Sequence, residues 1–311
     1  MQCTFPPGKA AHDAPWIDLL EPTEAEVAAM SAAHGIRIPS RAMLEEIETS
    51  SRLQVQDDAI VATMPITSGP EHGPPVRRPL GLILTQDLFV TVRYGEVHGI
   101  TRARAALADS KGDVTSVAAF MCVLEGMVDY AADELERLGA MLNDASQRIF
   151  QQPDTQSPRA NFALKAMLRA VGRVGERLSH IRESLLALER IAPFVAGKAK
   201  PWLGSREQGR LDILEQDAKS LAEFEVHLTD KTQFLLDAVL GFISTEQNDI
   251  FRVLTIVSVL GIPPTFIASM YGMNFDTIHE YHWRHGYLWA LSLIFLSILL
   301  PAWWFKRRGW F

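Results

Sequence analysis

The sequence predicts an α+β domain, α/β/α-like in its layering, followed by long helices and two C-terminal transmembrane helices. Three observations support this fold class. Short runs of β-branched and aromatic residues alternate with turn signals early in the chain, apolar residues then recur at steps of three and four, and two long apolar stretches come last. With 311 residues and 48% hydrophobic content, the chain can bury a sizeable core.

Residues 1–110 are expected to form a mixed α/β module. Thr23 and Glu26 have the spacing of a capping box, which predicts a helix that ends near Gly35. A turn-rich segment at 68–79 separates strand-like runs. Strands are expected at residues 53–55, 59–64, 80–85 and 88–94.

Residues 111–249 are expected to form long helices, at 114–149, at 159–191, and from Ser205 onward, where Ser205 and Gln208 have the spacing of a second capping box. Leucines then recur every seven residues from Leu214 to Leu235, as a packed long helix requires. Two interpretations of this seam stay open: antiparallel packing within one chain, or bundling of several subunits.

Two apolar stretches follow, at residues 250–270 and 286–305. The first contains one ionic residue, Arg252, close to its beginning, and the second contains none. Each is long enough to cross the hydrocarbon core of a bilayer, so two transmembrane helices are expected rather than buried helices of a soluble core. Residues 271–285 would form the loop between them, and residues 306–311 a basic tail.

The basic residues predict the orientation. Lys306, Arg307 and Arg308 directly follow the second stretch. In the loop, by contrast, the one Lys or Arg residue is Arg284. Cytoplasmic flanks of membrane helices are enriched in Lys and Arg, so the C-terminus is expected in the cytoplasm. Two spans return the N-terminal region to the same side, and residues 1–16 lack the apolar run of a signal peptide. A multi-pass protein with both termini cytoplasmic is expected.

Composition argues against several classes of function. A net charge of −7 does not fit a nucleic-acid-binding surface. Cys3 and Cys122 have neither the spacing of a zinc site nor that of a disulfide framework, and no covalent cofactor is expected. The sequence shows no Walker-type phosphate loop and no recognisable grouping of nucleophile, base and orienting group, so an enzyme is not expected.

A stripe of small and polar residues follows one face of the first apolar helix. At alternating steps of four and three, the face carries Asp237, Gly241, Ser244, Asn248, Phe251, Thr255, Ser258, Ile262, Thr265 and Ser269. Hydroxyl residues can simply join helices. Here, however, the stripe includes an amide and a carboxylate, which suit a hydrated cation. One such face cannot enclose a pathway, so a closed homo-oligomer in the lipid membrane is expected.

The residues after this helix resemble a known signature. Gly272, Met273 and Asn274, preceded by Tyr271, resemble the Gly-Met-Asn motif of the CorA family of magnesium transporters. Further shared features are Gln247 and Asn248, the segment 263–265, and the ending at 305–310. The close resemblance covers about residues 235–311, whereas the rest agrees in layout only.

The resemblance implies a funnel-shaped homopentamer in the bacterial inner (plasma) membrane, with the first spans lining a pore. It would take up Mg2+, and also cobalt or nickel, driven by the membrane potential and gated by an intracellular cation at a site that the motifs do not identify. Asn274 would hold the hydrated ion at the entrance, with Gly272 and Met273 shaping the turn. Phe251 and Leu254 would form a hydrophobic gate. The implied pore-lining residues are Asp237, Asn248, Thr255, Ile262 and Thr265; Ile262 stands where relatives often carry methionine, and Ser269 where glycine is common.

The loop departs from the family pattern. It contains His279, Glu280, His282 and His285, where an acidic loop is typical, and spaced histidines can bind zinc. A zinc transporter of the ZntB type therefore stays open as an alternative. A second alternative, from another class, is a membrane-anchored scaffold or sensor without ion flux, which would not explain the polar stripe.

Overall fold

The computed structural model describes residues 2–6, 13–46, 48–56, 58–68, 76–109, 114–151, 158–273 and 282–310. The chain divides into two compact units. The first comprises Met1–Gln152 and Lys165–Leu236, and the second comprises Pro153–Leu164 and Asp237–Phe311. Asn274, His279 and Glu280 of the predicted site lie outside the described residues.

A six-stranded mixed sheet forms the centre of the first unit. Its spatial order is β1-β2-β6-β5-β4-β3, and β2 and β6 form its parallel pair, with Ile17 opposite Val90. The expected α+β fold class is confirmed, and each of the four predicted strand runs overlaps a strand. Strands β1 and β2 were not predicted. The strands are β1 (Gln2–Phe5), β2 (Trp16–Leu20), β3 (Leu53–Gln56), β4 (Ala59–Ser68), β5 (Val76–Leu84) and β6 (Phe89–Arg93).

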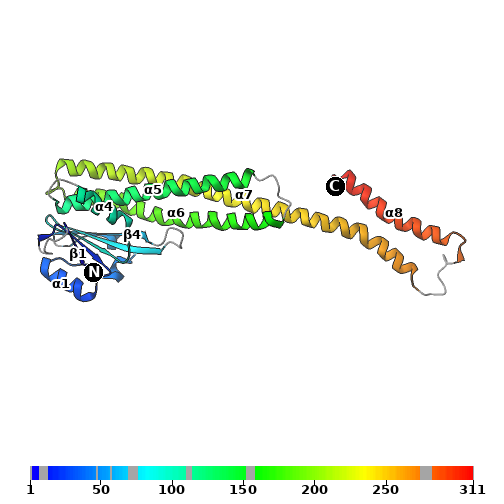
Figure 1. Cartoon of the computed structure of the whole chain (residues 1–311), viewed down its shortest axis with the longest axis horizontal. Helices are drawn as coiled ribbons and strands as arrows, with labels where there is room; N and C mark the ends of the chain where they lie inside the picture. Colours follow the sequence, from blue (N-terminus) through cyan, green and yellow to red (C-terminus); the bar gives the residue numbers. More distant parts are fainter. Residues whose placement is uncertain are drawn as a thin grey trace. The chain divides into compact units, whose positions relative to one another are not determined.

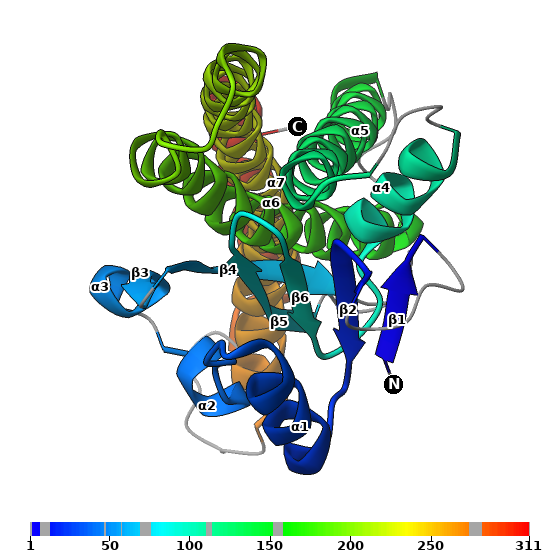
Figure 2. The same cartoon turned by 90° about the vertical axis from the view of Figure 1, so that its left-hand side faces the viewer.

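Helices cover both faces of this sheet, as Figure 2 shows. One face carries α1 (Glu24–His34) and α2 (Arg41–Leu44), packed on a core that includes Ile17, Val61 and Val90, and α3 (Thr49–Arg52) leads into β3. The other face carries α4 (His98–Asp109) and α5 (Ser116–Gln151). The layers are therefore α/β/α, as predicted from the sequence.

The predicted first helix is confirmed together with its two ends. The backbone N–H of Glu26 donates to the Thr23 hydroxyl oxygen, and the Glu26 carboxylate accepts from the Thr23 backbone N–H. These reciprocal bonds satisfy two N–H groups at the start of α1. Gly35 ends the helix with φ at 63°, a left-handed conformation that glycine adopts without strain.

Three long helices run alongside one another in the first unit: α5, most of α6 (Pro158–Lys198) and the first part of α7 (Ser205–Tyr271) (Figures 1 and 2). Leu214, Leu228 and Leu235 of the predicted seam are buried within this single chain, and Leu221 is half-buried. Packing inside one chain therefore accounts for the seven-residue repeat. α8 (Gly286–Arg307) belongs to the second unit.

The predicted capping role of Ser205 is wrong by one position. The N–H of Gln208 donates to the carbonyl of Gly204 at 3.0 Å, so Gly204 accepts the first bond of the helix and takes the N-cap place. Ser205 is instead the first helical residue of α7.

Candidate ion pathway

Two helices in the described part of the chain are long and apolar enough to cross a membrane: α7, through its C-terminal part, and α8. α8 ends in basic residues that contact aromatic rings. The guanidinium of Arg307 lies 4.9 Å from the ring centroid of Trp303, and that of Arg308 lies 4.5 Å from the centroid of Trp304. Such pairs suit a membrane–water interface, because the ring is amphipathic and the cation can reach the headgroups.

The predicted polar stripe lies on α7, and its side chains are exposed except for Ser258, which is half-buried. Most of the half-buried side chains lie on another side of the helix. Since each residue of an α-helix is rotated by about 100° from the one before, this side is centred about 150° from the middle of the stripe. Its half-buried residues are Ile256, Leu260, Pro263, Pro264, Ile267 and Tyr271. One side of the helix is therefore partly covered, and the side with the stripe is open.

Two threonines of the stripe bind their own helix. Thr255 Oγ1 donates to the carbonyl of Phe251 at 2.7 Å, and Thr265 Oγ1 donates to the carbonyl of Gly261 at 2.8 Å. Each hydroxyl hydrogen is thereby used, while the lone pairs of the oxygen can still accept. Water molecules around a cation point their hydrogens outward, so an exposed oxygen of this kind is suited to a hydrated ion. The amide of Asn248 and the carboxylate of Asp237 add acceptor oxygens to the same face.

Large apolar side chains interrupt the stripe. Phe251 is 64% exposed and Ile262 is 66% exposed, while Leu254, beside the stripe, is 59% exposed. A soluble helix rarely leaves so much apolar surface uncovered in one segment. This helix is therefore suited to lipid or to further copies of the chain.

α7 continues through Pro263 and Pro264 without ending. Neither proline has an N–H, so the carbonyls of Val259 and Leu260 lack their usual partner four residues on. In a membrane these two oxygens need another donor, such as water or a side chain of a neighbouring helix.

The described part of the Gly-Met-Asn motif closes the end of α7. The N–H of Gly272 donates to the carbonyls of Ala268 and Ser269, and the N–H of Met273 donates to that of Met270. Asn274 comes next and lies outside the described residues. Its role at the pore entrance therefore remains a prediction.

Of the four loop residues, the structure describes two. His282 is exposed, and His285 precedes α8, with its carbonyl accepting from the N–H of Trp289 at 3.0 Å. Over the described residues, no group of three or more His, Cys, Asp or Glu side chains is placed to hold a metal ion. The loop zinc site stays a prediction, since His279 and Glu280 are not described.

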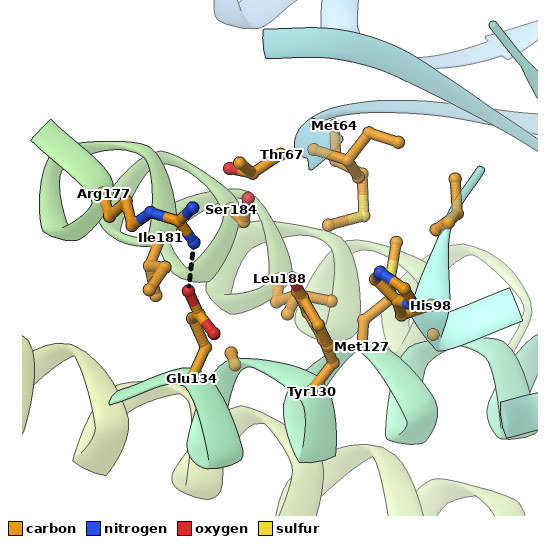
Figure 3. Close-up of a pocket in the computed structure, with 14 residues that line it drawn as sticks. Met64, Thr67, His98, Met127, Tyr130, Glu134, Arg177, Ile181, Ser184 and Leu188 are labelled. Atoms are coloured by element: carbon orange, nitrogen blue, oxygen red, sulfur yellow. Dashed lines mark hydrogen bonds and ion pairs between the residues drawn. The ribbon is translucent and has the colours of Figure 1, made fainter. Parts of the chain in front are cut away.

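A cavity of about 40 Å³ lies between the sheet and the helices α5 and α6 of the first unit (Figure 3). It has room for water only. At its edge, Arg177 Nη1 donates to Glu134 Oε1 at 3.0 Å, and Arg137 binds the same carboxylate. Burial by itself would raise the pKa of Glu134, but the two guanidinium groups outweigh it and hold the pKa below its usual value. This carboxylate is thus engaged in an ion-pair network and is poorly suited to bind a metal ion.

Comparison with known proteins assigns the chain to a family. The family described as "CorA-like Mg2+ transporter protein" matches residues 12–307, which is nearly the whole chain. The chain belongs to this family. It is a family of ion transporters rather than of enzymes, and the resemblance noted in the sequence is confirmed.

Individual CorA relatives match along almost their full length. The chain is 30% identical to the magnesium transport protein CorA of Escherichia coli (strain K12) over 301 residues, covering 96% of this chain and 92% of the relative. The CorA protein of Salmonella typhimurium is 29% identical over the same length.

Among solved structures, the complete CorA magnesium transporter of Methanocaldococcus jannaschii matches with a TM-score of 0.75 at 17% identity, covering 98% of this chain and 94% of that one. The full-length CmaX protein matches with a TM-score of 0.69 at 16% identity, covering 95% of this chain and 88% of that one. These two structures support the fold of the whole chain.

Proposed function

We propose that this protein transports divalent cations, with Mg2+ as its main substrate, across the bacterial inner membrane. The observation that carries the proposal is the exposed face of α7, on which Asn248, Thr255 and Thr265 present acceptor oxygens within a helix apolar enough to span a bilayer. The CorA relatives named as magnesium transport proteins support the choice of ion.

Such a face needs copies of itself to enclose a path. We propose a homopentamer in which five α7 helices turn their stripes to a common axis. The proposed pore-lining side chains, from the cytoplasmic end outward, are Asp237, Ser244, Asn248, Thr255, Ser258, Ile262, Thr265 and Ser269. Rings of Phe251 and Leu254 would form an apolar constriction that closes by excluding water.

Ion selection would depend on the water shell. Mg2+ gives up its water reluctantly, so neutral oxygens that bind the shell suit it better than a tight charged cage. We place Asn274 at the entrance, supported by the turn that Gly272 and Met273 begin. An inside-negative potential favours entry by about 2.3 kcal/mol per charge per 100 mV, and by about twice that for a divalent ion. Cobalt and nickel are proposed as further substrates, with closure by an intracellular cation.

One observation favours a second candidate. His282 and His285 lie on the loop side of α8, and imidazole is a ligand for zinc. A zinc transporter of the ZntB type would use these side chains to attract its ion.

Flux measurements on the purified protein in liposomes test the proposal. Uptake of Mg2+, Co2+, Ni2+ and Zn2+ is followed with and without a proton gradient. Asn274→Ala should abolish uptake, and Thr255→Val should lower it several-fold by removing one acceptor from each subunit. Ser292→Ala is the matched control, because Ser292 on α8 also binds its own helix, at 2.7 Å from the carbonyl of Leu288, but lies off the stripe.

The outcomes separate the candidates. Full activity of Asn274→Ala would refute the proposed entrance, and absence of any metal flux would leave a membrane-anchored scaffold or sensor. Uptake that prefers zinc and requires the proton gradient would favour the zinc transporter.

A further inference from the structure

A polar cavity of about 260 Å³ opens in the first unit, and its lining includes no residue of the polar stripe. It lies where α2, α3 and the strands β4 and β5 meet, and its wall includes Arg52 from α3, Thr63 and Pro65 from β4, and Arg77 and Arg78 from β5. It is several times larger than the cavity of Figure 3 and has room for a small ligand.

Three guanidinium groups face this cavity with donors to spare. Arg52 Nε donates to the carbonyl of Glu46 at 3.0 Å, and Arg78 Nη1 donates to the carbonyl of Tyr94. Arg78 Nε is buried and finds no acceptor among the described residues. A guanidinium has five N–H donors, so these contacts use a minority of them.

The nearby carboxylates are already engaged. Glu45 also lines the cavity, but its Oε1 lies 2.9 Å from Arg41 Nε. Glu183 Oε2 lies 2.8 Å from Arg77 Nε. Arg78 Nη1 in turn lies 3.8 Å from Glu21 Oε1. Glu183 and Glu21 thus balance two of the three arginines, Glu45 is balanced by Arg41, and one positive charge remains in excess among the described residues.

The environment of Arg52 shows the same surplus. Burial, followed by the positive charges of Arg77 and Arg190, lowers the pKa of Arg52, and Glu183 only partly offsets this. An arginine side chain stays protonated at neutral pH, so the repulsion persists in the folded protein. A bound anion would relieve it.

We propose that this cavity is a binding site for a small phosphate-bearing anion. The fork of N–H groups on a guanidinium matches two oxygens of a phosphate, and a phosphate monoester carries about −1.5 to −2 charges near neutral pH. A divalent cation would be repelled by the three arginines. The site is therefore opposite in charge to the proposed transported cation, and it is built from other residues than the proposed pathway.

Calorimetric titration of pyrophosphate into the metal-free full-length protein in detergent tests this site. Saturable binding is expected, and Arg52→Gln and Arg77→Gln should each weaken it about tenfold or more, since each removes a charged donor. Arg148→Gln is the matched control. Arg148 is an exposed helical arginine, 2.9 Å from Asp144, outside the cavity. Its removal should leave the affinity unchanged.

Two further measurements keep the result decisive. Pyrophosphate should raise the thermal unfolding midpoint of the unmodified protein, a readout that does not depend on any variant. Citrate serves as a carboxylate probe of similar charge and should bind more weakly. The proposal is overturned by lack of saturable pyrophosphate binding, by equal effects of Arg52→Gln and Arg148→Gln, or by tighter binding of citrate.

Discussion

Arg93 binds Asp18 across the parallel pair of strands β2 and β6, with Nε and Nη2 each 3.0 Å from Oδ2. The two side chains are 8% and 2% exposed. Thr91 donates to the other carboxylate oxygen at 2.6 Å, and Arg104 reaches Oδ2 from α4. One buried acid therefore joins two strands and the helix that covers them.

Replacing this acid should destabilise the first unit. Asp18→Asn leaves Arg93 buried without a counter-charge, which typically costs about 3–5 kcal/mol. The thermal unfolding midpoint of the purified protein should fall by several degrees. Asp144→Asn, which breaks an exposed ion pair with Arg148, should change it little. Equal midpoints for the two variants would show that the buried network does not stabilise the fold.

Two glycines of α5 should respond differently to a methyl group. A Cβ at Gly126 would lie 2.5 Å from the carbonyl oxygen of Gly99 on α4, so Gly126→Ala must push two backbones apart, at about 1–3 kcal/mol. At Gly139 the nearest atom would be Leu228 Cδ2, at 3.5 Å. Gly139→Ala should therefore be neutral or slightly stabilising, since alanine favours helices. Thermal unfolding compares the two variants, and a tolerated Gly126→Ala would contradict the close contact of α4 with α5.

The Glu134 network predicts a dependence of stability on pH. Although burial opposes it, the ion pairs with Arg137 and Arg177 hold the pKa of Glu134 below its value in the unfolded chain. The contribution of the Glu134 charge to the free energy of unfolding is therefore present above about pH 4.5, and it is lost as the pH falls through the lowered pKa of Glu134 in the folded state. The difference in unfolding midpoint between the unmodified protein and Glu134→Gln should be largest near neutral pH and should shrink below about pH 4.5. A difference independent of pH would show that the charge of Glu134 is not responsible.

Cysteine labelling tests which side of α7 meets water. In a background with Cys3 and Cys122 replaced by serine, Thr255→Cys and Ser269→Cys should react with a charged, membrane-impermeant thiol reagent under conditions that permit ion flow. Ile267→Cys, on the half-buried side of the same helix, should react much more slowly. The reverse order of rates would place the stripe away from the aqueous path.

The sequence predicted most of the architecture because the strongest signals are periodic. The capping box at Thr23 predicted the start of α1, the leucine seam predicted a long α7, and the two apolar stretches coincide with helices that can span a membrane. The polar stripe could be assigned before the fold was known, because helical spacing alone places its members on one face.

Other features could not be predicted, since they depend on contacts between distant segments. Strand β2 is short and contains a charged residue, Asp18, whose partners Thr91 and Arg93 follow more than 70 positions later. The cavity beside Arg52 also depends on distant residues, because β5 brings Arg77 and Arg78 to α3. The short run Trp16–Leu20 contains Trp16 and Ile17, whose residue types favour strands, and this is a local signal that could have indicated β2.

α7 carries its leucine seam and its polar stripe on a single helix. The number of residues between the two patterns therefore determines the angle between them around the helix axis. Each residue added or removed between Leu235 and Ser244 would turn every later side chain by about 100° with respect to the seam. The length of this connecting segment is thus as constrained as its composition. Substitutions in this segment should be far better tolerated than insertions or deletions. The exception is an insertion or deletion that spans a whole number of helical turns, because it keeps the angle between the seam and the stripe.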